Sequence, residues 1–169
     1  MEVDMFNLLV AAALLTAPVN GPFRVEVSSV GASSAAPRHY VLLATDATKL
    51  LPNSRAPIDA ALRAKGWTPA EKGERPDAWV TVGFYSAEVD RGAKTLDRKS
   101  YRSWLTLEAV DKAPTSSGPR KLLWFVATST MSGNDDYRAI YSALVAPITA
   151  FLGRSAAPLT TVTVRPTID

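Results

Sequence analysis

Residues 78–129 hold the pattern that most constrains the fold. Three segments rich in β-branched and aromatic residues follow one another at 78–89, 101–110 and 121–129. Such residues fit a pleated, half-buried surface. The intervening segments 90–100 and 111–119 are too short to hold a crossover helix, so hairpins must connect neighbouring strands. The sequence therefore predicts three consecutive antiparallel strands as the centre of the fold.

The flanking sequence predicts further strands and two helices. Residues 22–30 and 39–45 have strand character. Residues 159–164 are expected to form a last strand, placed at an edge because prolines bound it. A helix is expected after Ser54 as N-cap, ending at Gly66. A second begins at Asn134, with a kink or break near Pro147. The expected fold class is α+β: a mainly antiparallel sheet of five to six strands with two helices packed on one face.

The first 21 residues differ from the rest of the chain. An unbroken apolar run at residues 8–15 is followed by small residues and Pro18. Its length is too short for a membrane span but fits a secretory signal peptide, although Glu2 and Asp4 replace the usual basic start. The alternative is a short core helix. We expect residues 1–21 to be a signal peptide, residues 22–169 to form one domain, and the mature chain to have no transmembrane span.

Composition excludes several kinds of chemistry. The chain of 169 residues contains no cysteine, which excludes disulfides, thiolate catalysis and cysteine-based zinc sites. Its formal net charge is only +3. No nucleic-acid-binding motif accompanies this charge, so a nucleic-acid partner is not expected. Such a partner would show affinity that falls steeply with added salt.

A short set of motifs resembles a known family. The helix end Ala60–Trp67, the turn Pro76-Asp77, the strand 79–82 and the later Leu122-Leu123-Trp124 strand are similar in layout to bacterial envelope proteins of domain-of-unknown-function family 4136. The resemblance covers about residues 38–152. Many members look like lipoproteins, but the lipidated cysteine of such members is missing here. The resemblance implies an envelope or periplasmic location and an α+β fold, and brings no catalytic residues.

The aromatic residues of the central strands form the main candidate site. If Val80 and Leu105 face the helices, then Trp79, Tyr85 and Trp104 must lie on the opposite face, where Trp124 could join them. An exposed aromatic patch often marks a binding surface. Alternatively, the amino-terminal segment, a partner subunit or long neighbouring side chains cover these rings. The sequence leaves both interpretations open.

A cationic hairpin is the second candidate site. Five basic residues gather between the first two central strands: Arg91, Lys94, Arg98, Lys99 and Arg102. They could contact anionic envelope polymers or lipid head groups. The simpler interpretation is a solvated hairpin tip. We include Arg98 and Arg102 with the aromatic residues as candidate binding residues.

Two other features lead to weaker hypotheses. His39 is the only histidine, and with a nearby carboxylate it could act as a general base, although no nucleophile motif accompanies it. Asn134-Asp135-Asp136 lacks the looped pattern of a calcium site, and helix capping explains it. We therefore expect no metal site, no cofactor and no catalytic residues.

These observations favour a non-enzymatic protein of the cell envelope. It would bind an envelope protein or an anionic polymer through a sheet face or the cationic hairpin. The alternative is a small exported hydrolase that uses His39 with a carboxylate.

Overall fold

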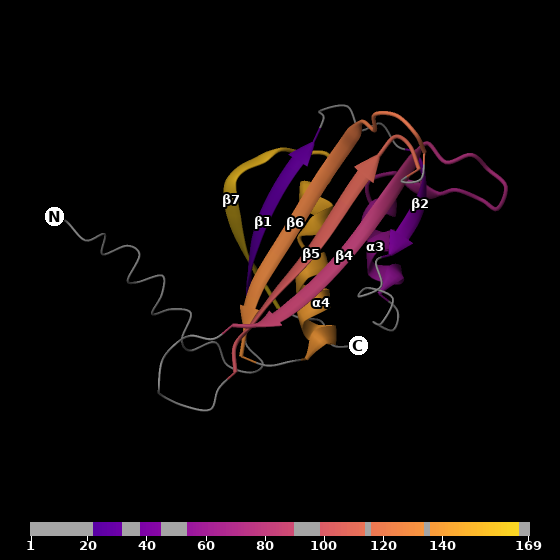
Figure 1. Ribbon diagram of the computed structural model, residues 1–169. Coiled ribbons are helices and arrows are strands. Elements are labelled where there is room, and N and C mark those ends of the chain that lie inside the picture. The colour runs from indigo at the N-terminus through magenta and orange to yellow at the C-terminus, as the bar shows by residue number, and fades with distance from the viewer. Residues whose placement is uncertain are drawn as a thin grey trace.

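A computed structural model describes residues 22–31, 38–44, 54–89, 99–113, 116–133 and 136–165. It confirms the α+β class: one open sheet carries helices on one face (Figure 1). The sheet contains seven strands in the order β3-β2-β4-β5-β6-β1-β7. Their bounds are β1 Phe23–Gly31, β2 His39–Ala44, β3 Thr68–Pro69, β4 Ala78–Glu88, β5 Tyr101–Val110, β6 Leu122–Ser132 and β7 Ala156–Val164.

The three central strands pair as predicted. β4 pairs with β5 and β5 with β6, both antiparallel, and β1 and β7 continue the antiparallel part. The expectation of a mainly antiparallel sheet of five to six strands is wrong, however, because the sheet is mixed and has seven strands. β2 lies parallel to both β4 and β3. β1 and β2 follow each other in the chain but lie on opposite sides of the central strands.

The parallel pairing follows from what separates β2 from β4. Parallel neighbours need a crossover connection, usually a helix. Here the connection contains α3 (Arg55–Arg63) and the short β3. The sequence predicted α3 and the strands β2 and β4, but it predicted neither β3 nor the crossover that these elements form. This unit places α3 on the same face of the sheet as the second helix (Figure 1).

The helix boundaries follow the expected signals with one correction. α3 ends before Gly66, which adopts φ 80°. Ser54 is the N-cap residue, yet its side chain makes no capping hydrogen bond. α4 (Tyr137–Val145) is capped by Asp136, whose carboxylate accepts from the amides of Arg138 and Ala139. The expected cap, Asn134, lies outside the described residues. α4 and α5 (Ile148–Phe151) are separated at Pro147, as the sequence predicts.

The core lies between the sheet and these helices. Alternate residues of β4 and β5 point into it, and the apolar faces of α3 and α4 cover them. Burial is complete or nearly complete for Val80, Val82, Leu105, Leu107, Ile58, Leu62, Ile140 and Leu144. The opposite face of the sheet carries no helix among the described residues. In Figure 1 the sheet lies in front of the helices, so this view looks onto the helix-free face.

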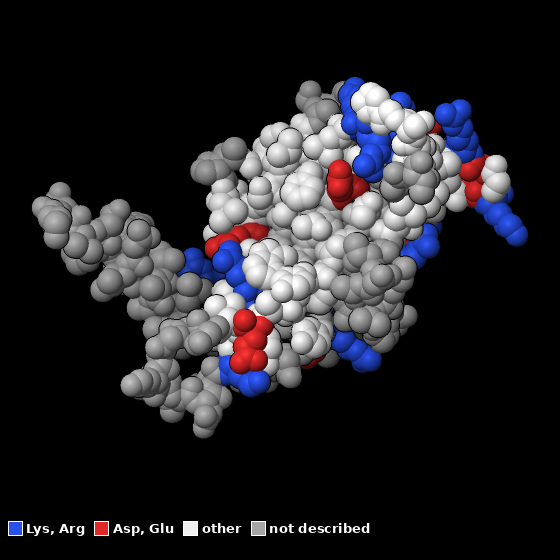
Figure 2. All heavy atoms as spheres, viewed as in Figure 1, with Lys and Arg blue, Asp and Glu red and all other residues white. Residues whose placement is uncertain are grey.

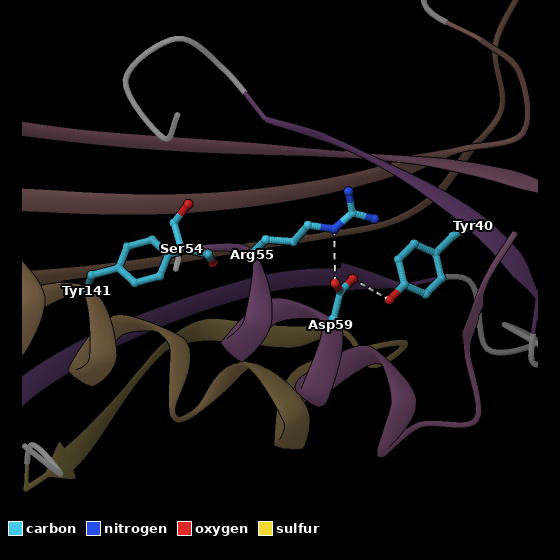
Figure 3. Close-up of polar contacts among 5 residues, drawn as sticks. All are labelled: Tyr40, Ser54, Arg55, Asp59 and Tyr141. Atoms are coloured by element: carbon cyan, nitrogen blue, oxygen red, sulfur yellow. Dashed lines mark hydrogen bonds and ion pairs between the residues drawn. The ribbon is translucent and has the colours of Figure 1, made fainter. Parts of the chain in front are cut away.

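Two tyrosine hydroxyls tie the helices together and to the sheet (Figure 3). Tyr40 in β2 donates a 2.6 Å hydrogen bond to the carboxylate of Asp59 in α3. The same carboxylate also accepts a 3.0 Å hydrogen bond from the Arg55 guanidinium. Tyr141 in α4 donates a 2.7 Å bond to the Ser54 carbonyl at the start of α3. Burial, and for Tyr40 also the Asp59 bond, raises the pKa of both phenols. Each phenol therefore keeps its proton and acts as a hydrogen-bond donor.

Candidate binding surface

The helix-free face of the sheet is the surface on which the candidate residues lie. Alternation along β4 and β5 places Trp79, Tyr85 and Trp104 on it, opposite the buried valines and leucines, as predicted. Figure 2 views this face and shows a largely uncharged middle, with charged side chains in separate groups. The surface offers aromatic and hydroxyl groups rather than a continuous charged patch.

Tyr85 and Trp104 form the most accessible part of this face. They lie directly opposite each other in β4 and β5, and their ring centroids are 5.4 Å apart with a 32° interplanar angle. Tyr85 is 62% exposed, while Trp104 is half-buried. Aromatic pairs at this separation attract each other beyond the area that they bury. The pair thus presents a pre-formed aromatic surface to solvent.

Arg102 completes this surface on one side. Its guanidinium lies 5.4 Å from the centroid of the Trp104 ring and 3.5 Å from the Glu26 carboxylate. Ser129 also donates to Glu26, at 3.1 Å. The guanidinium is therefore oriented by a ring and a carboxylate together, although both charges remain partly in water. Tyr85, Trp104, Ser129 and Glu26 share one row across four neighbouring strands. We call Tyr85, Trp104, Arg102, Glu26 and Ser129 the aromatic row.

Trp79 lies on the same face but not in the aromatic row. It pairs with Val110 at the far end of β4, six residues from Tyr85. At about 3.4 Å per residue this separation is roughly 20 Å. The expected single surface around Trp79 and Trp104 is therefore divided into two aromatic positions.

Trp124 does not belong to this surface, so its inclusion among the candidate binding residues is wrong. It is 1% exposed and lies in the core on the helix side. Its ring meets that of Trp67 edge to face, with centroids 5.6 Å apart. The register of the β5–β6 pairing leaves Trp124 opposite the buried Ala109, which sets its side of the sheet.

The cationic hairpin is only partly described. Arg98, Arg91 and Lys94 lie outside the described residues. Lys99 forms an ion pair with Glu88 at 3.1 Å, and Arg102 belongs to the aromatic row. Of the two candidate arginines, the structure thus brings Arg102 to the aromatic residues.

His39 has a carboxylate partner. Its Nδ1 contacts the carboxylate of Glu74, and its backbone amide donates to Asp77 at 3.2 Å. The histidine side chain is 51% exposed. Among the described residues no hydroxyl group hydrogen-bonds to the ring. The arrangement supplies a histidine and an acid but no bound nucleophile.

The described residues contain neither a metal-binding cluster nor a helix able to span a membrane. Within the described segments no group of histidine, aspartate and glutamate side chains has the arrangement of a metal site. Asp136 caps α4, as helix capping of the Asn134-Asp135-Asp136 triplet predicts, and the other two residues are not described. No helix in the described part of the chain has the length and hydropathy needed to cross a membrane.

Glu26 and Ser129 are the residues of the aromatic row that the sequence did not identify. The alternation of β1 already placed Glu26 on the face opposite Val25 and Val27. Its neighbours could not be known, however, because β1 pairs with β6 more than 100 positions away. A prediction of that pairing would have been the only signal for these two residues.

Comparisons with known proteins give a fold but no family. No protein-family model matches the chain, and no curated protein matches it. The resemblance to family 4136 therefore stays a prediction. Among solved structures, two forms of the PelC dodecamer from Paraburkholderia phytofirmans are similar at 14% and 12% identity, each with a TM-score of 0.46. The two matches cover 77% and 78% of this chain, and 98% and 99% of the respective PelC chains.

A third solved structure is similar over more of the chain. It is a PDZ domain protein from Parabacteroides distasonis ATCC 8503, with 10% identity and a TM-score of 0.52. The match covers 90% of this chain and only 42% of that protein. At such low identity the likeness concerns the fold alone: the α+β arrangement of this chain also occurs within a larger bacterial protein.

Proposed function

We propose that this protein is a non-enzymatic protein of the cell envelope that binds a partner through the aromatic row. The observation that carries the proposal is the pairing of the exposed Tyr85 with Trp104 beneath the Arg102 guanidinium. Large aromatic side chains and arginines dominate the energy of binding surfaces, because they bury much area at little conformational cost. The signal-like residues 1–21 support export, and the resemblance to family 4136 supports an envelope location.

The geometry favours an extended or flat partner surface. The aromatic row lies on a sheet face, and those of its members that lie on different strands (Tyr85, Trp104, Ser129 and Glu26) are spaced by the interstrand distance of about 4.8 Å. Ser129 and Glu26 continue the row with oxygen atoms that can accept hydrogen bonds. A partner would therefore place an apolar group on Tyr85 and Trp104 and polar groups over the neighbouring strands.

Photo-crosslinking in living cells tests this proposal. A photoreactive phenylalanine derivative replaces Tyr85, and the same derivative replaces the exposed Ala60 of α3 as the matched control. We expect a discrete crosslinked product from position 85, its loss when Trp104→Ala is added, and no such product from position 60. Equal products from both positions, or none from position 85, would contradict binding at this face.

Fractionation tests the location separately. The full chain is expressed with an epitope at its carboxyl end, and the mature amino terminus is sequenced. Export predicts a periplasmic or envelope-associated protein that has lost about the first 20 residues, within the usual length range of signal peptides. A cytoplasmic protein that begins at Met1 would contradict the proposed location but not the binding surface.

The contact of His39 with Glu74 keeps a hydrolase as the second candidate. A carboxylate on Nδ1 can orient a histidine for general-base catalysis of water attack. Hydrolysis of p-nitrophenyl butyrate by the purified protein tests this hypothesis. If the dyad is catalytic, Glu74→Gln and His39→Gln each remove the activity. A rate that only His39→Gln lowers would indicate an exposed imidazole acting alone.

A further inference from the structure

Among the described strands β7 ends the sheet, and one of its edges has no neighbour in that part of the chain. In the strand order β7 is last, and it pairs only with β1. Within the described residues no other segment hydrogen-bonds to its outer side. The strand is nine residues long, so this outer edge offers a row of backbone groups along most of the length of the sheet.

The start of β7 is held firmly against β1. Ser155 and Gly31 exchange two hydrogen bonds of 3.2 Å, and the amide of Ala156 donates to Ser29 at 3.1 Å. A Cβ atom at Gly31 would lie only 2.6 Å from the carbonyl carbon of Gly153. This close approach holds the start of β7 against β1. Beyond the register shift between Val27 and Ser29, residues 160–164 pair regularly with β1 and can serve as the template for a further strand.

Pro158 near the start of β7 lacks an amide donor, but from residue 159 onward the side chains of β7 do not protect this edge. Exposed edges normally carry lysines or other charges that prevent strand addition. Residues 156–164 contain no charged side chain. Val162 and Val164 pack only partly against the core, and Leu159 is 58% exposed. A segment beside β7 could therefore place apolar side chains against these residues and bury them further.

Most of the charges near β7 are positive. Among the described residues, the acidic side chain that β1 places opposite the strand is Glu26, beside Thr161, and Arg102 already holds it. Arg154 and Arg165 flank the strand, and Arg24 lies opposite Thr163 in β1. All three arginines are exposed, and none forms an ion pair with a described carboxylate. Antiparallel pairing of two copies through β7 would bring the arginines at opposite ends of the strands together. Like charges so placed disfavour a second copy and favour an acidic segment.

We propose that the outer edge of β7 binds an extended segment of another protein by strand addition. The segment has alternating apolar residues in its middle and acidic residues at both ends. Backbone hydrogen bonds to residues 159–164 supply the pairing, and the flanking arginines select acidic ends and set the register. This site is independent of the aromatic row, which lies on the sheet face.

Fluorescence anisotropy with a labelled synthetic peptide tests the proposal. The peptide has the sequence Glu-Glu-Thr-Val-Thr-Val-Thr-Val-Glu-Glu, and a second peptide has lysines in place of the four glutamates. We expect the acidic peptide to bind the wild-type protein and the basic peptide not to bind. A third peptide, N-methylated at alternate residues, should not bind because it lacks the amide donors.

Charge reversal on the protein provides the matched control. The double variant Arg154→Glu/Arg165→Glu should bind the acidic peptide at least roughly tenfold more weakly and should gain affinity for the basic peptide. The variant Arg120→Glu reverses an exposed arginine in the β5–β6 turn and should bind as the wild type does. Binding of the acidic peptide should also persist in Trp104→Ala, which separates this proposal from the aromatic row.

Three results would overturn the proposal. They are absence of acidic-peptide binding at millimolar concentration, equal binding by the charge-reversed variant, and binding that survives N-methylation. Hydrogen exchange provides a second measurement: the amides of residues 159–164 in β7 should slow on binding, while the Thr68 amide of β3 at the other edge should not. A dimer in sedimentation equilibrium that protects β7 would mean that a second copy is the occupant, which also contradicts an acidic partner.

Discussion

Tyr40 and Asp59 are joined by a 2.6 Å hydrogen bond that connects β2 to α3 across the crossover unit. Tyr40 is 1% exposed, and the carboxylate is also held by Arg55. Because β2 pairs with both β3 and β4, this bond fixes the helix over the parallel part of the sheet.

Removing that hydroxyl should destabilise the protein moderately. Tyr40→Phe keeps the ring but loses a bond to a charged acceptor, which we expect to lower the free energy of unfolding by about 1.5 kcal/mol. Urea unfolding monitored by circular dichroism measures the change. The matched control Tyr85→Phe alters an exposed tyrosine and should change stability by less than about 0.5 kcal/mol. Equal losses in the two variants would contradict the role of the Tyr40 bond.

The two buried phenols predict a loss of stability in alkali. The pKa of Tyr40 and of Tyr141 is raised in the folded protein, mainly by burial. Below the unfolded-state pKa, about 10, both states keep the proton and the stabilisation is complete. Above it the unfolded chain ionises first, so stability falls as pH rises, by up to about 1.4 kcal/mol per pH unit for each phenol.

Unfolding curves between pH 8 and 11.5 check this dependence, with that range chosen to span the pKa of about 10. The double variant Tyr40→Phe/Tyr141→Phe should be less stable at neutral pH but should lose less stability as pH rises. A slope equal to that of the wild type would show that these phenols do not govern alkaline unfolding.

Because Gly31 lies close to the backbone of Gly153, replacing Gly31 with alanine should loosen β7 locally. Gly31→Ala would force apart the backbones of β1 and Gly153, so we expect a loss of about 1–3 kcal/mol. Amide hydrogen exchange should accelerate in residues 156–164 more than in β4. Gly133→Ala is the control, because a Cβ there meets nothing within 4 Å. Uniform acceleration across the sheet would argue against a local effect.

The two tryptophans Trp124 and Trp104 should differ sharply in their effects on stability. Trp124→Ala empties a core position and should cost about 3–5 kcal/mol. Trp124→Phe should cost less, since among the described residues the Trp124 indole nitrogen has no hydrogen-bond partner to lose. Trp104→Ala should cost only about 1 kcal/mol, because its ring lies on the helix-free face. Chemical unfolding of the three variants measures these differences.

Local sequence pattern was sufficient to predict the helices and most of the strands. It also predicted which side chains of β4 and β5 lie on the helix-free face of the sheet. Alternation placed Trp79, Tyr85 and Trp104 opposite Val80 and Leu105, because side chains of a strand alternate whatever the strand pairs with. The same local physics explains the helix stop at Gly66 and the break at Pro147.

Trp124 shows where that pattern fails. Residues 122–126 of β6 are apolar on both faces, so alternation carries no signal there. The register of the pairing with β5 decides that the Trp124 ring enters the core beside Trp67.

By itself the sequence determined which segments form the helices and most of the strands, because those signals lie within a few residues of each other; it missed β3 and the first residues of β7. Tertiary structure alone decided that β2 runs parallel to β4 and that β1 lies between β6 and β7. These pairings join segments far apart in the chain, and they create both the contact of Arg102 with Glu26 and the free edge of β7. Long-range pairing depends on the summed packing of many residues, which no short motif encodes.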